Sequence, residues 1–282
     1  MLLIGLTGSI ATGKSTVSAL LRSPLYNLPI IDADVLARQV VEPGTYGYRR
    51  VIAAFRASTP DLLLPPTDTG DGGKGEVEKS GDGGKDRGRG RPLNRAALGR
   101  RVFGSSASRV RDRKVLNGII HPLVRLAMLR QVLYYFVWGH WAVVLDIPLL
   151  FESGLDVFCG VVVMVAVSDP VVQMRRLRER DQALSAGEAE ERVGSQMGVG
   201  EKVGAAKAKG ERRGKVVIND GTREELEMEV QRVVTEVKKE GGYGWWRVLV
   251  WGNPITAVVT GFWDVWLSWR ARRQRQRERK EK

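Results

Sequence analysis

Short apolar runs alternate with stretches of helical periodicity over the first 240 residues. Five of these runs are almost wholly apolar, and we interpret them as strands at residues 2–6, 29–32, 141–146, 161–167 and 215–218. Strands of this kind are buried on both faces, which is typical of a parallel sheet with helices on each side. The pattern predicts an α/β fold in which a parallel sheet is flanked by helices.

Two stretches interrupt this pattern. Residues 57–92 contain many Gly, Asp, Lys and Arg residues and almost no apolar side chain after Leu64, so we expect a disordered surface insertion there. An Arg-Gly run inside it leaves a binding role open as the alternative. Residues 198–214 are rich in Gly, Lys, Glu and Ala. We expect them to be mobile and to belong to a lid region at 183–214, of the kind that closes over phosphates.

The first strand leads into a phosphate-binding loop at residues 8–15, Gly-Ser-Ile-Ala-Thr-Gly-Lys-Ser. Between a strand and a helix, the amides of this motif converge on phosphate at the helix N-terminus. The motif predicts the P-loop NTPase form of the α/β fold. Lys14 would bridge the outer phosphates of ATP, and the Ser15 hydroxyl would bind Mg²⁺. The residues assigned to ATP here are Gly8, Ser9, Ile10, Ala11, Thr12, Gly13, Lys14, Ser15 and Thr16.

Carboxylates follow two of the predicted strands. Asp32 and Asp34 come at the end of the second strand, and in an extended segment their side chains project to the same side, near the edge where open α/β sheets bind ligands. One of them would orient and deprotonate an acceptor hydroxyl. Asp146 ends the third strand and is a candidate to hold Mg²⁺ through its water shell. Capping of a following helix or turn is the alternative role for each residue.

Arginines are concentrated where the charge of a transferring phosphoryl group would need neutralising. Arg176 and Arg180 share one helical face after the fourth strand, and Arg175 and Arg178 form an adjacent pair. Arg192 lies in the predicted lid. The alternative for each of these side chains is exposure to solvent or a salt bridge. Arg192 is favoured for a role at the nucleotide because it lies in a segment that is expected to close.

The composition narrows the class of protein. The chain has 282 residues, 43% of them apolar, which is enough for a hydrophobic core. One cysteine and two histidines exclude an intramolecular disulfide framework and make zinc chemistry unfavourable. Residues 1–7 form a core strand with no secretory signal before it, so we expect a cytoplasmic protein.

The net charge of +13 suggests an anionic partner, but its distribution weakens that interpretation. Residues 270–282 contain eight basic and two acidic side chains, so +6 of the total lies in this tail. The remainder does not require nucleic acid, and we expect none as a partner.

Residues 241–282 combine tryptophans, an apolar stretch and the basic tail, beyond a catalytic domain at 1–240. Six of the eight tryptophans lie here: Trp245, Trp246, Trp251, Trp263, Trp266 and Trp269. Tryptophan favours the bilayer interface, and arginine favours anionic headgroups. We therefore expect residues 245–282 to attach the protein to the cytosolic face of a membrane. Asn253, Pro254 and Asp264 disfavour a full span, and packing on the catalytic domain as an extra helix is the alternative.

Together, these motifs resemble the dephospho-CoA kinase family. The resemblance covers about residues 2–240, apart from the two interrupting stretches. It is carried by residues 5–17, 31–44, 93–99, 120–123 and 146–152. The sequence departs from the family pattern in a loop centre with fewer glycines, Ile10-Ala11-Thr12, and in a longer stretch at 199–214.

The resemblance implies transfer of the γ-phosphoryl group of ATP to the ribose 3′-hydroxyl of dephospho-CoA, which gives CoA and ADP. It also implies a helical acceptor-binding subdomain. By the same resemblance, Asp34 is the catalytic base, and Arg176, Arg192 and Asn219 lie on the nucleotide and lid side. With Lys14 of the loop, Arg192 is expected to assist catalysis. Arg95 and His121 match segments of that subdomain, and the residues that we expect to bind the acceptor are Thr7, Asp32, Asp34, Arg38, Arg95 and His121.

Two other functions share some of these features. Another P-loop kinase, acting on a small molecule or a nucleotide, would have the same loop, and a nucleic-acid-stimulated ATPase would account for the basic tail. A GTPase is disfavoured because the sequence contains no Asn-Lys-x-Asp segment for reading guanine.

Overall fold

The computed structural model describes residues 1–65, 91–104, 106–181, 187, 193–194, 197–240, 266 and 269. They belong to two compact units, which we describe separately. One unit combines Met1–Asp32 with the described residues from Gln131 onward, and the other is Ala33–Arg130. The chain leaves the first unit directly after Asp32 and re-enters it within the long helix α5 (Ala107–Val137).

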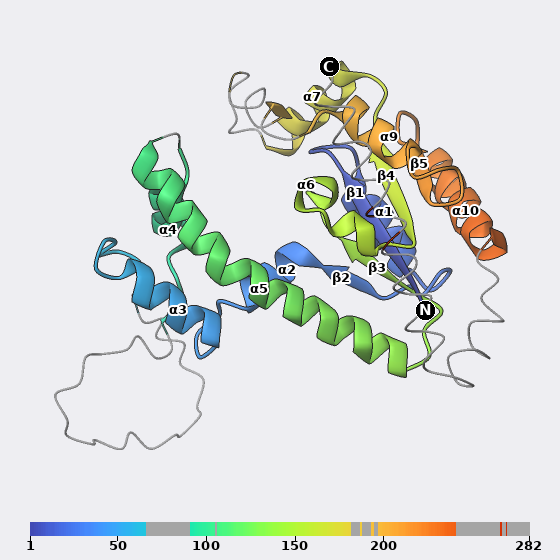
Figure 1. Ribbon diagram of the computed structural model, residues 1–282. Helices are drawn as coiled ribbons and strands as arrows, with labels where there is room; N and C mark the ends of the chain where they lie inside the picture. The colour runs from blue at the N-terminus through green and yellow to red at the C-terminus, as the bar shows by residue number, and fades with distance from the viewer. Residues whose placement is uncertain are drawn as a thin grey trace, which may run out of the picture. The chain divides into compact units, whose positions relative to one another are not determined.

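A five-stranded parallel sheet forms the centre of the first unit (Figure 1). In order across the sheet, the strands are β2 (Ile30–Asp32), β3 (Ala142–Asp146), β1 (Leu2–Gly8), β4 (Val161–Ala166) and β5 (Gly214–Ile218). Every position of β3 and β4 is buried, as expected for apolar runs with helices on both sides. The predicted strands and their parallel arrangement are confirmed.

Helices α1 (Lys14–Arg22) and α10 (Arg223–Glu240) cover one face of this sheet (Figure 1). Their apolar side chains pack with Leu6 of β1 and Val163 of β4 in the main hydrophobic core. The strand register aligns Leu6 with Val163 and Val163 with Lys215, so Lys215 projects from the same face toward α10.

The next row of the register, Gly5, Val162 and Gly214, faces the opposite side. Here α6 (Leu150–Ser153) and α9 (Val199–Lys207) approach the strands closely. A Cβ on Gly5 would lie 2.7 Å from a Leu150 methyl carbon, and a Cβ on Gly214 would lie 1.9 Å from the Ala206 carbonyl oxygen. Glycine at these positions lets the helices pack against the sheet.

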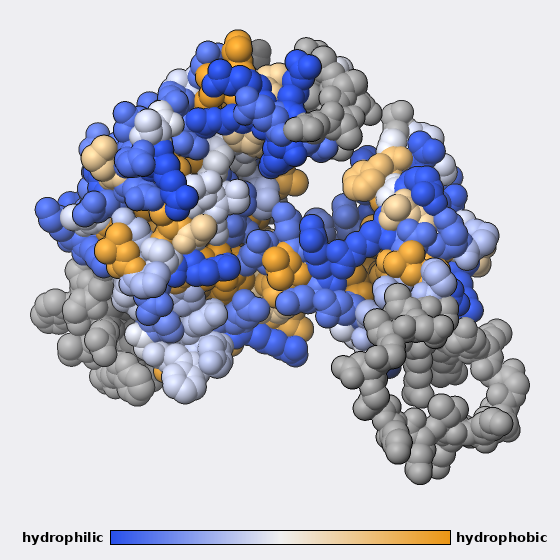
Figure 2. Space-filling model, turned by 180° about the vertical axis from the view of Figure 1, so that it is seen from behind, coloured by the Kyte–Doolittle hydropathy of each residue, from blue (hydrophilic) through white to orange (hydrophobic). Residues whose placement is uncertain are grey.

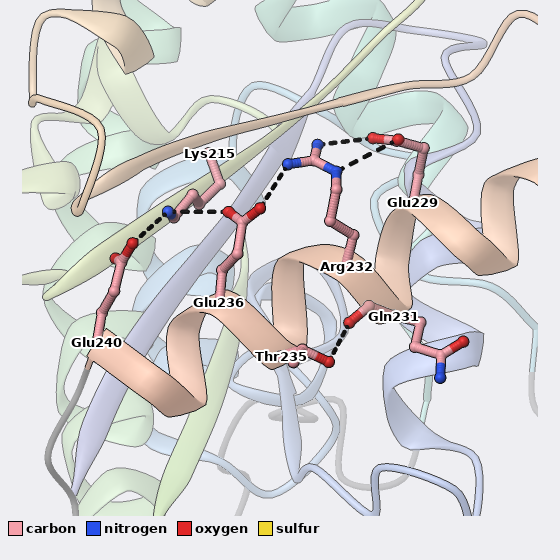
Figure 3. A network of polar contacts seen from close by, with 7 residues as sticks. All are labelled: Lys215, Glu229, Gln231, Arg232, Thr235, Glu236 and Glu240. Atoms are coloured by element: carbon pink, nitrogen blue, oxygen red, sulfur yellow. Dashed lines mark hydrogen bonds and ion pairs between the residues drawn. The ribbon is translucent and has the colours of Figure 1, made fainter.

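Ion pairs join β5 to α10 (Figure 3). The Lys215 ammonium lies 3.0 Å from the Glu236 carboxylate and 3.1 Å from that of Glu240, one turn further along the helix. Burial alone would lower the pKa of Lys215, but its hydrogen bonds to the two glutamates outweigh burial and raise it. Arg232 bridges Glu229 and Glu236 at 2.8 Å each. The network fixes the last turns of α10 against the edge strand.

Residues 199–214 differ from the mobile segment that their composition predicts. Residues 199–207 form α9, and residues 214–218 form β5. Within α9, Lys202 and Ala206 are completely buried, so this helix is part of the packed first unit. Most residues from 182 to 196 lie outside the described residues, and the lid stays a prediction for them.

The second unit is helical. It contains α2 (Ala33–Gln39), α3 (Tyr46–Phe55), α4 (Arg95–Val102) and the first part of α5. Its core is formed by Tyr48, Val51, Phe55, Leu62, Leu93, Leu98 and Val102. Asn94 caps α4 by accepting a hydrogen bond from the Ala97 amide at 3.1 Å, as short polar side chains do at helix N-termini.

Both ends of the predicted insertion at 57–92 are ordered in this unit. Leu62 is 1% exposed, and Leu63 pairs with Leu93 in an antiparallel bridge. The Tyr48 hydroxyl donates to the Arg91 carbonyl oxygen at 2.5 Å. The prediction of disorder is therefore wrong for residues 57–65, where Leu62 reaches the core, and for residues 91–92, which hydrogen bonds hold to Tyr48 and Leu64. Residues 66–90 lie outside the described residues.

The predicted membrane-attachment segment also lies outside the described residues, apart from Trp266 and Trp269. Both of these residues are helical, and each is 43% exposed. In the part of the chain that the structure describes, no helix is both long enough and apolar enough to cross a membrane. On the face drawn in Figure 2, hydrophobic residues occur in small separate patches among hydrophilic ones.

Candidate active site

The phosphate-binding loop joins β1 to α1 at the carboxyl end of a central strand. Gly13 adopts φ +88°, a left-handed conformation, and a Cβ there would lie 2.1 Å from Asn219 Nδ2. A Cβ on Gly8 would lie 2.8 Å from the Thr12 hydroxyl, which itself donates to the Ser9 carbonyl oxygen at 2.9 Å. The two glycines therefore keep the loop compact, as the motif predicts.

The loop contains features that suit an anionic ligand. Ser9 is 7% exposed, and within the described residues its Oγ has no hydrogen-bond partner. Helix α1 begins at Lys14, and no side chain caps its N-terminus, so its first amides and the positive end of its dipole are available. A buried hydroxyl without a partner, beside an uncapped helix N-terminus, fits a phosphate group with several acceptor oxygens.

Lys14 and Asp146 form an ion pair beside the loop. Asp146 is the last residue of β3 and is 3% exposed, so its charge requires a partner. The strand register aligns it with Leu6 of β1 and with Asp32 of β2. Two carboxylates therefore end neighbouring strands at the same edge of the sheet.

The oxygen ligands at this edge fit Mg²⁺. Asp146 supplies a carboxylate and the exposed Ser15 a hydroxyl, and Mg²⁺ typically takes one or two protein ligands together with waters and substrate phosphates. Among the described residues, no group of three or more His, Cys, Asp or Glu side chains is suited to a metal ion. An ion held here would thus depend on phosphate and water oxygens to complete its coordination.

Side chains from α7 (Pro170–Arg180) and from the end of β5 support the loop. Gln173 Nε2 donates to the Ile10 carbonyl oxygen at 2.7 Å, and Asn219 Nδ2 donates to that of Thr12 at 2.9 Å. Arg176 Nη1 donates to the Asn219 carbonyl oxygen at 2.7 Å. The structure therefore brings Arg176 and Asn219 to the loop. Sequence reasoning missed Gln173, although its i, i+3 spacing from Arg176 was a usable signal.

The carbonyl oxygen of Pro148 links three elements next to Asp146. It accepts hydrogen bonds from the Thr7 hydroxyl at 3.0 Å and from the Lys202 ammonium at 3.2 Å. Lys202 also lies 3.1 Å from the Glu152 carboxylate. Thr7 was predicted to bind the acceptor, and in this structure its hydroxyl positions the segment that follows β3. No pattern in the sequence marks Lys202 as a buried residue.

Asp32 and Asp34 do not belong to one extended segment, so the alternation used to place them on one side is wrong. Strand β2 ends at Asp32 and α2 begins at Ala33, which puts Asp34 in the first turn of that helix. Asp32 is half-buried and Asp34 is exposed. The two residues also fall in different compact units.

Arg38, Arg95 and His121, which were predicted to bind the acceptor, all lie in the second unit. Arg38 is in the last turn of α2, Arg95 opens α4, and His121 lies in α5 beside Pro122. All three side chains are exposed. Contact of these residues with an acceptor stays a prediction.

Of the remaining predicted arginines, Arg192 lies outside the described residues. Arg175 lies 3.9 Å from Glu179 in an i, i+4 pair on the surface of α7, and both side chains are about two-thirds exposed. Arg175 therefore has the alternative role, that of a solvated arginine in a salt bridge. A surface pair of this kind contributes little to stability.

A sequence model of one protein family, described as dephospho-CoA kinase, matches residues 2–64 and 86–222 of the chain. The matched ranges contain the phosphate-binding loop, Asp32, Asp146, α7 and Asn219. The chain belongs to the dephospho-CoA kinase family. The resemblance drawn from the sequence motifs is thereby confirmed.

Other members of the dephospho-CoA kinase family are similar over most of their length. The dephospho-CoA kinase of Saccharomyces cerevisiae is 40% identical over 238 residues, which cover 84% of this chain and 83% of the relative. That of Geobacillus kaustophilus is 39% identical over 235 residues, with coverage of 83% and 96%. A crystal structure of a Thermus thermophilus protein matches with a TM-score of 0.60 at 28% identity, covering 84% of this chain and 97% of the other.

Proposed function

We propose that this chain transfers the γ-phosphoryl group of ATP to the ribose 3′-hydroxyl of dephospho-CoA, giving CoA and ADP in the last step of CoA biosynthesis. The observation that carries the phosphoryl-transfer part is the loop at residues 8–15, which opens α1 beside the Lys14–Asp146 pair. The identity of the acceptor is supported by membership of the family and by the names of its members.

The proposed mechanism relies on positioning and charge. Phosphoryl transfer passes through a loose transition state, so fixed hydrogen-bond donors and cations supply most of the acceleration. We assign Lys14 and the loop amides to the outer phosphates, and Arg192 and Arg176 to the nucleotide and lid side. Asp34 would accept the proton of the 3′-hydroxyl as its oxygen attacks the γ-phosphorus and the bond to the β-phosphate oxygen breaks.

We assign Mg²⁺ to Ser15 and Asp146, whose oxygens suit this ion. When bound, the ion would neutralise charge on the outer phosphates. Lys14 would then leave Asp146 for the phosphates. The ion pair supports this exchange. The buried Asp146 carboxylate needs a positive partner, which is Lys14 in this structure and would be Mg²⁺ once Lys14 has left.

The test is production of CoA by purified protein from ATP, Mg²⁺ and dephospho-CoA, followed by mass spectrometry. CoA is expected from the wild type and not from Lys14→Met, with ADP formed in equal amount. No product from folded protein that binds ADP would refute the acceptor assignment. A panel of other hydroxyl acceptors, and of RNA or DNA as stimulants of ATP hydrolysis, would then separate the two alternative functions.

We also propose that residues 245–282 attach the enzyme to a membrane surface. The support is in the sequence, where tryptophans precede an arginine-rich tail. Full-length protein is expected to float with anionic liposomes, and a chain ending at Glu240 is expected to remain unbound. Identical partitioning of the two would refute attachment through this segment.

A further inference from the structure

Two peptide groups of the phosphate-binding loop are held from the outside by side-chain amides. Gln173 binds the Ile10 carbonyl oxygen at 2.7 Å, and Asn219 binds the Thr12 carbonyl oxygen at 2.9 Å. Gln173 is 4% exposed, so its hydrogen bond is protected from competing water. Both contacts join residues more than 160 positions apart in the sequence.

The direction of these carbonyl groups fixes the direction of the amides that follow them. In a trans peptide the C=O and the next N–H point in opposite directions. A donor that holds the Ile10 oxygen on the side of α7 therefore turns the Ala11 N–H to the other side. In the same way, Asn219 turns the Gly13 N–H away from the end of β5. The Thr12 N–H between them is used inside the loop, where it donates to the Ser9 oxygen at 3.4 Å.

The loop requires such support because its backbone is not in a relaxed conformation. Ala11 has φ 60° and Gly13 has φ 88°. A left-handed conformation is unfavourable for a residue with a Cβ and persists when surrounding contacts hold it. Alternating backbone conformations of this kind form a concave group of N–H donors that binds anions.

We propose that Gln173 and Asn219 are positioning residues that aim the Ala11 and Gly13 amides at the outer phosphates of the nucleotide. The proposal rests on the proposed function for the identity of that nucleotide as ATP. Gln173 acts through the Ile10–Ala11 peptide, so its loss weakens the binding of phosphates and leaves the binding of the nucleoside unchanged. Arg176 extends the same support by holding the Asn219 backbone.

The test is the variant Gln173→Met, which keeps the length of the side chain and removes its donor. The matched control is Leu177→Ala, one turn along α7 at a fully buried position, which loosens packing without removing a hydrogen bond to the loop. Dissociation constants for ADP and adenosine are measured by calorimetry or by competition. We expect Gln173→Met to weaken the binding of ADP about tenfold and the binding of adenosine less than twofold. The control is expected to leave the ratio of the two affinities unchanged.

Two further measurements separate positioning from a general structural role. In ¹⁵N-labelled protein, the Ala11 amide is expected to shift downfield on ADP binding in the wild type and to lose most of that shift in Gln173→Met. In steady-state kinetics, the variant should raise the KM for ATP and leave that for dephospho-CoA unchanged. Equal losses for ADP and adenosine, unchanged ADP affinity, or an unaltered Ala11 shift would each overturn the proposal.

Failure of this proposal is distinguishable from failure of the proposed function. Wild-type protein that binds ADP and yields no CoA refutes the acceptor assignment, while the ADP and adenosine series still tests Gln173. Wild-type protein that yields CoA supports the function, whatever the result for Gln173→Met.

Discussion

Lys202 and Glu152 form an ion pair, and removal of each partner should destabilise the folded protein to a different extent. The two groups lie 3.1 Å apart, but the Lys202 side chain is completely buried, whereas that of Glu152 is 25% exposed. Lys202→Met leaves a carboxylate that water can reach. Glu152→Gln leaves a buried ammonium that keeps its hydrogen bond to the neutral Pro148 carbonyl oxygen but loses the carboxylate. We therefore expect Glu152→Gln to be the more destabilising change.

The magnitude follows from the distance and from the burial of each group. At 3.1 Å and an effective dielectric constant of about 20, the attraction is about 5 kcal/mol. Desolvation of the two ions offsets most of it, so the intact pair contributes little net stability. Removal of the carboxylate leaves the ammonium uncompensated and should cost about 3 kcal/mol or more. Removal of the ammonium should cost about 1–2 kcal/mol, because Glu152 regains hydration.

The assay is urea unfolding followed by circular dichroism, with the double variant completing a cycle. The chain contains its own control in the pair of Lys209 and Asp156, which lie 3.0 Å apart with side chains 4% and 3% exposed. Because both of these groups are buried, Lys209→Met and Asp156→Asn should cost similar amounts, each about 3–5 kcal/mol. The reasoning is refuted if Lys202→Met destabilises the protein as much as Glu152→Gln does.

Three further predictions concern the loop and the α10 network. Lys14→Ala should lower turnover at least tenfold more than Asp34→Asn, because we expect Lys14 to stabilise transition-state charge by ~2–4 kcal/mol; equal or reversed losses in steady-state kinetics would refute this order. Gly13→Ala should weaken ADP binding, measured by calorimetry, since its Cβ would lie 2.1 Å from Asn219 Nδ2, whereas Gly204→Ala, whose Cβ would have no neighbour within 4 Å beyond its own helix, should not. The hydrogen bond from Lys215 lowers the pKa of Glu236 below its ordinary value, so its stabilising effect is present at neutral pH and is lost as the pH falls through the folded-state pKa. Glu236→Gln should accordingly destabilise the protein at pH 7, with a difference from the wild type that shrinks in urea titrations toward pH 3.

The sheet could be predicted because its signal is local. Runs such as residues 161–167 are apolar at successive positions, and this pattern distinguishes a strand buried on both faces from an amphipathic helix. The loop could be predicted because its glycines, Lys14 and Ser15 occupy fixed spacings that the phosphate site itself requires. Both predictions depend on neighbours in the sequence, and the structure confirms their positions.

The supporting residues could not be predicted because their contacts are non-local. Gln173 meets Ile10 across 163 positions, and Lys202 meets Pro148 across 54. The buried face of α9 is formed by Lys202 and Ala206. Because neither residue is a large apolar one, the composition of Gly, Ala, Lys and Glu did not indicate a packed helix. Asp34 was misplaced for a different reason: the three-residue strand ends at Asp32, two positions before Asp34, so alternation along an extended segment does not apply.

The division of the chain places the proposed nucleotide residues in one unit and most of the proposed acceptor residues in the other, although Thr7 and Asp32 lie in the first unit. The loop, Lys14 and Asp146 belong to the unit built on the sheet, whereas Asp34, Arg38, Arg95 and His121 belong to the helical unit. Each unit has its own hydrophobic core, formed around Leu6 and Val163 in one and around Tyr48 and Phe55 in the other. Asp34, the proposed base, belongs to the acceptor unit although the chain places it only two residues beyond the strand paired with Asp146.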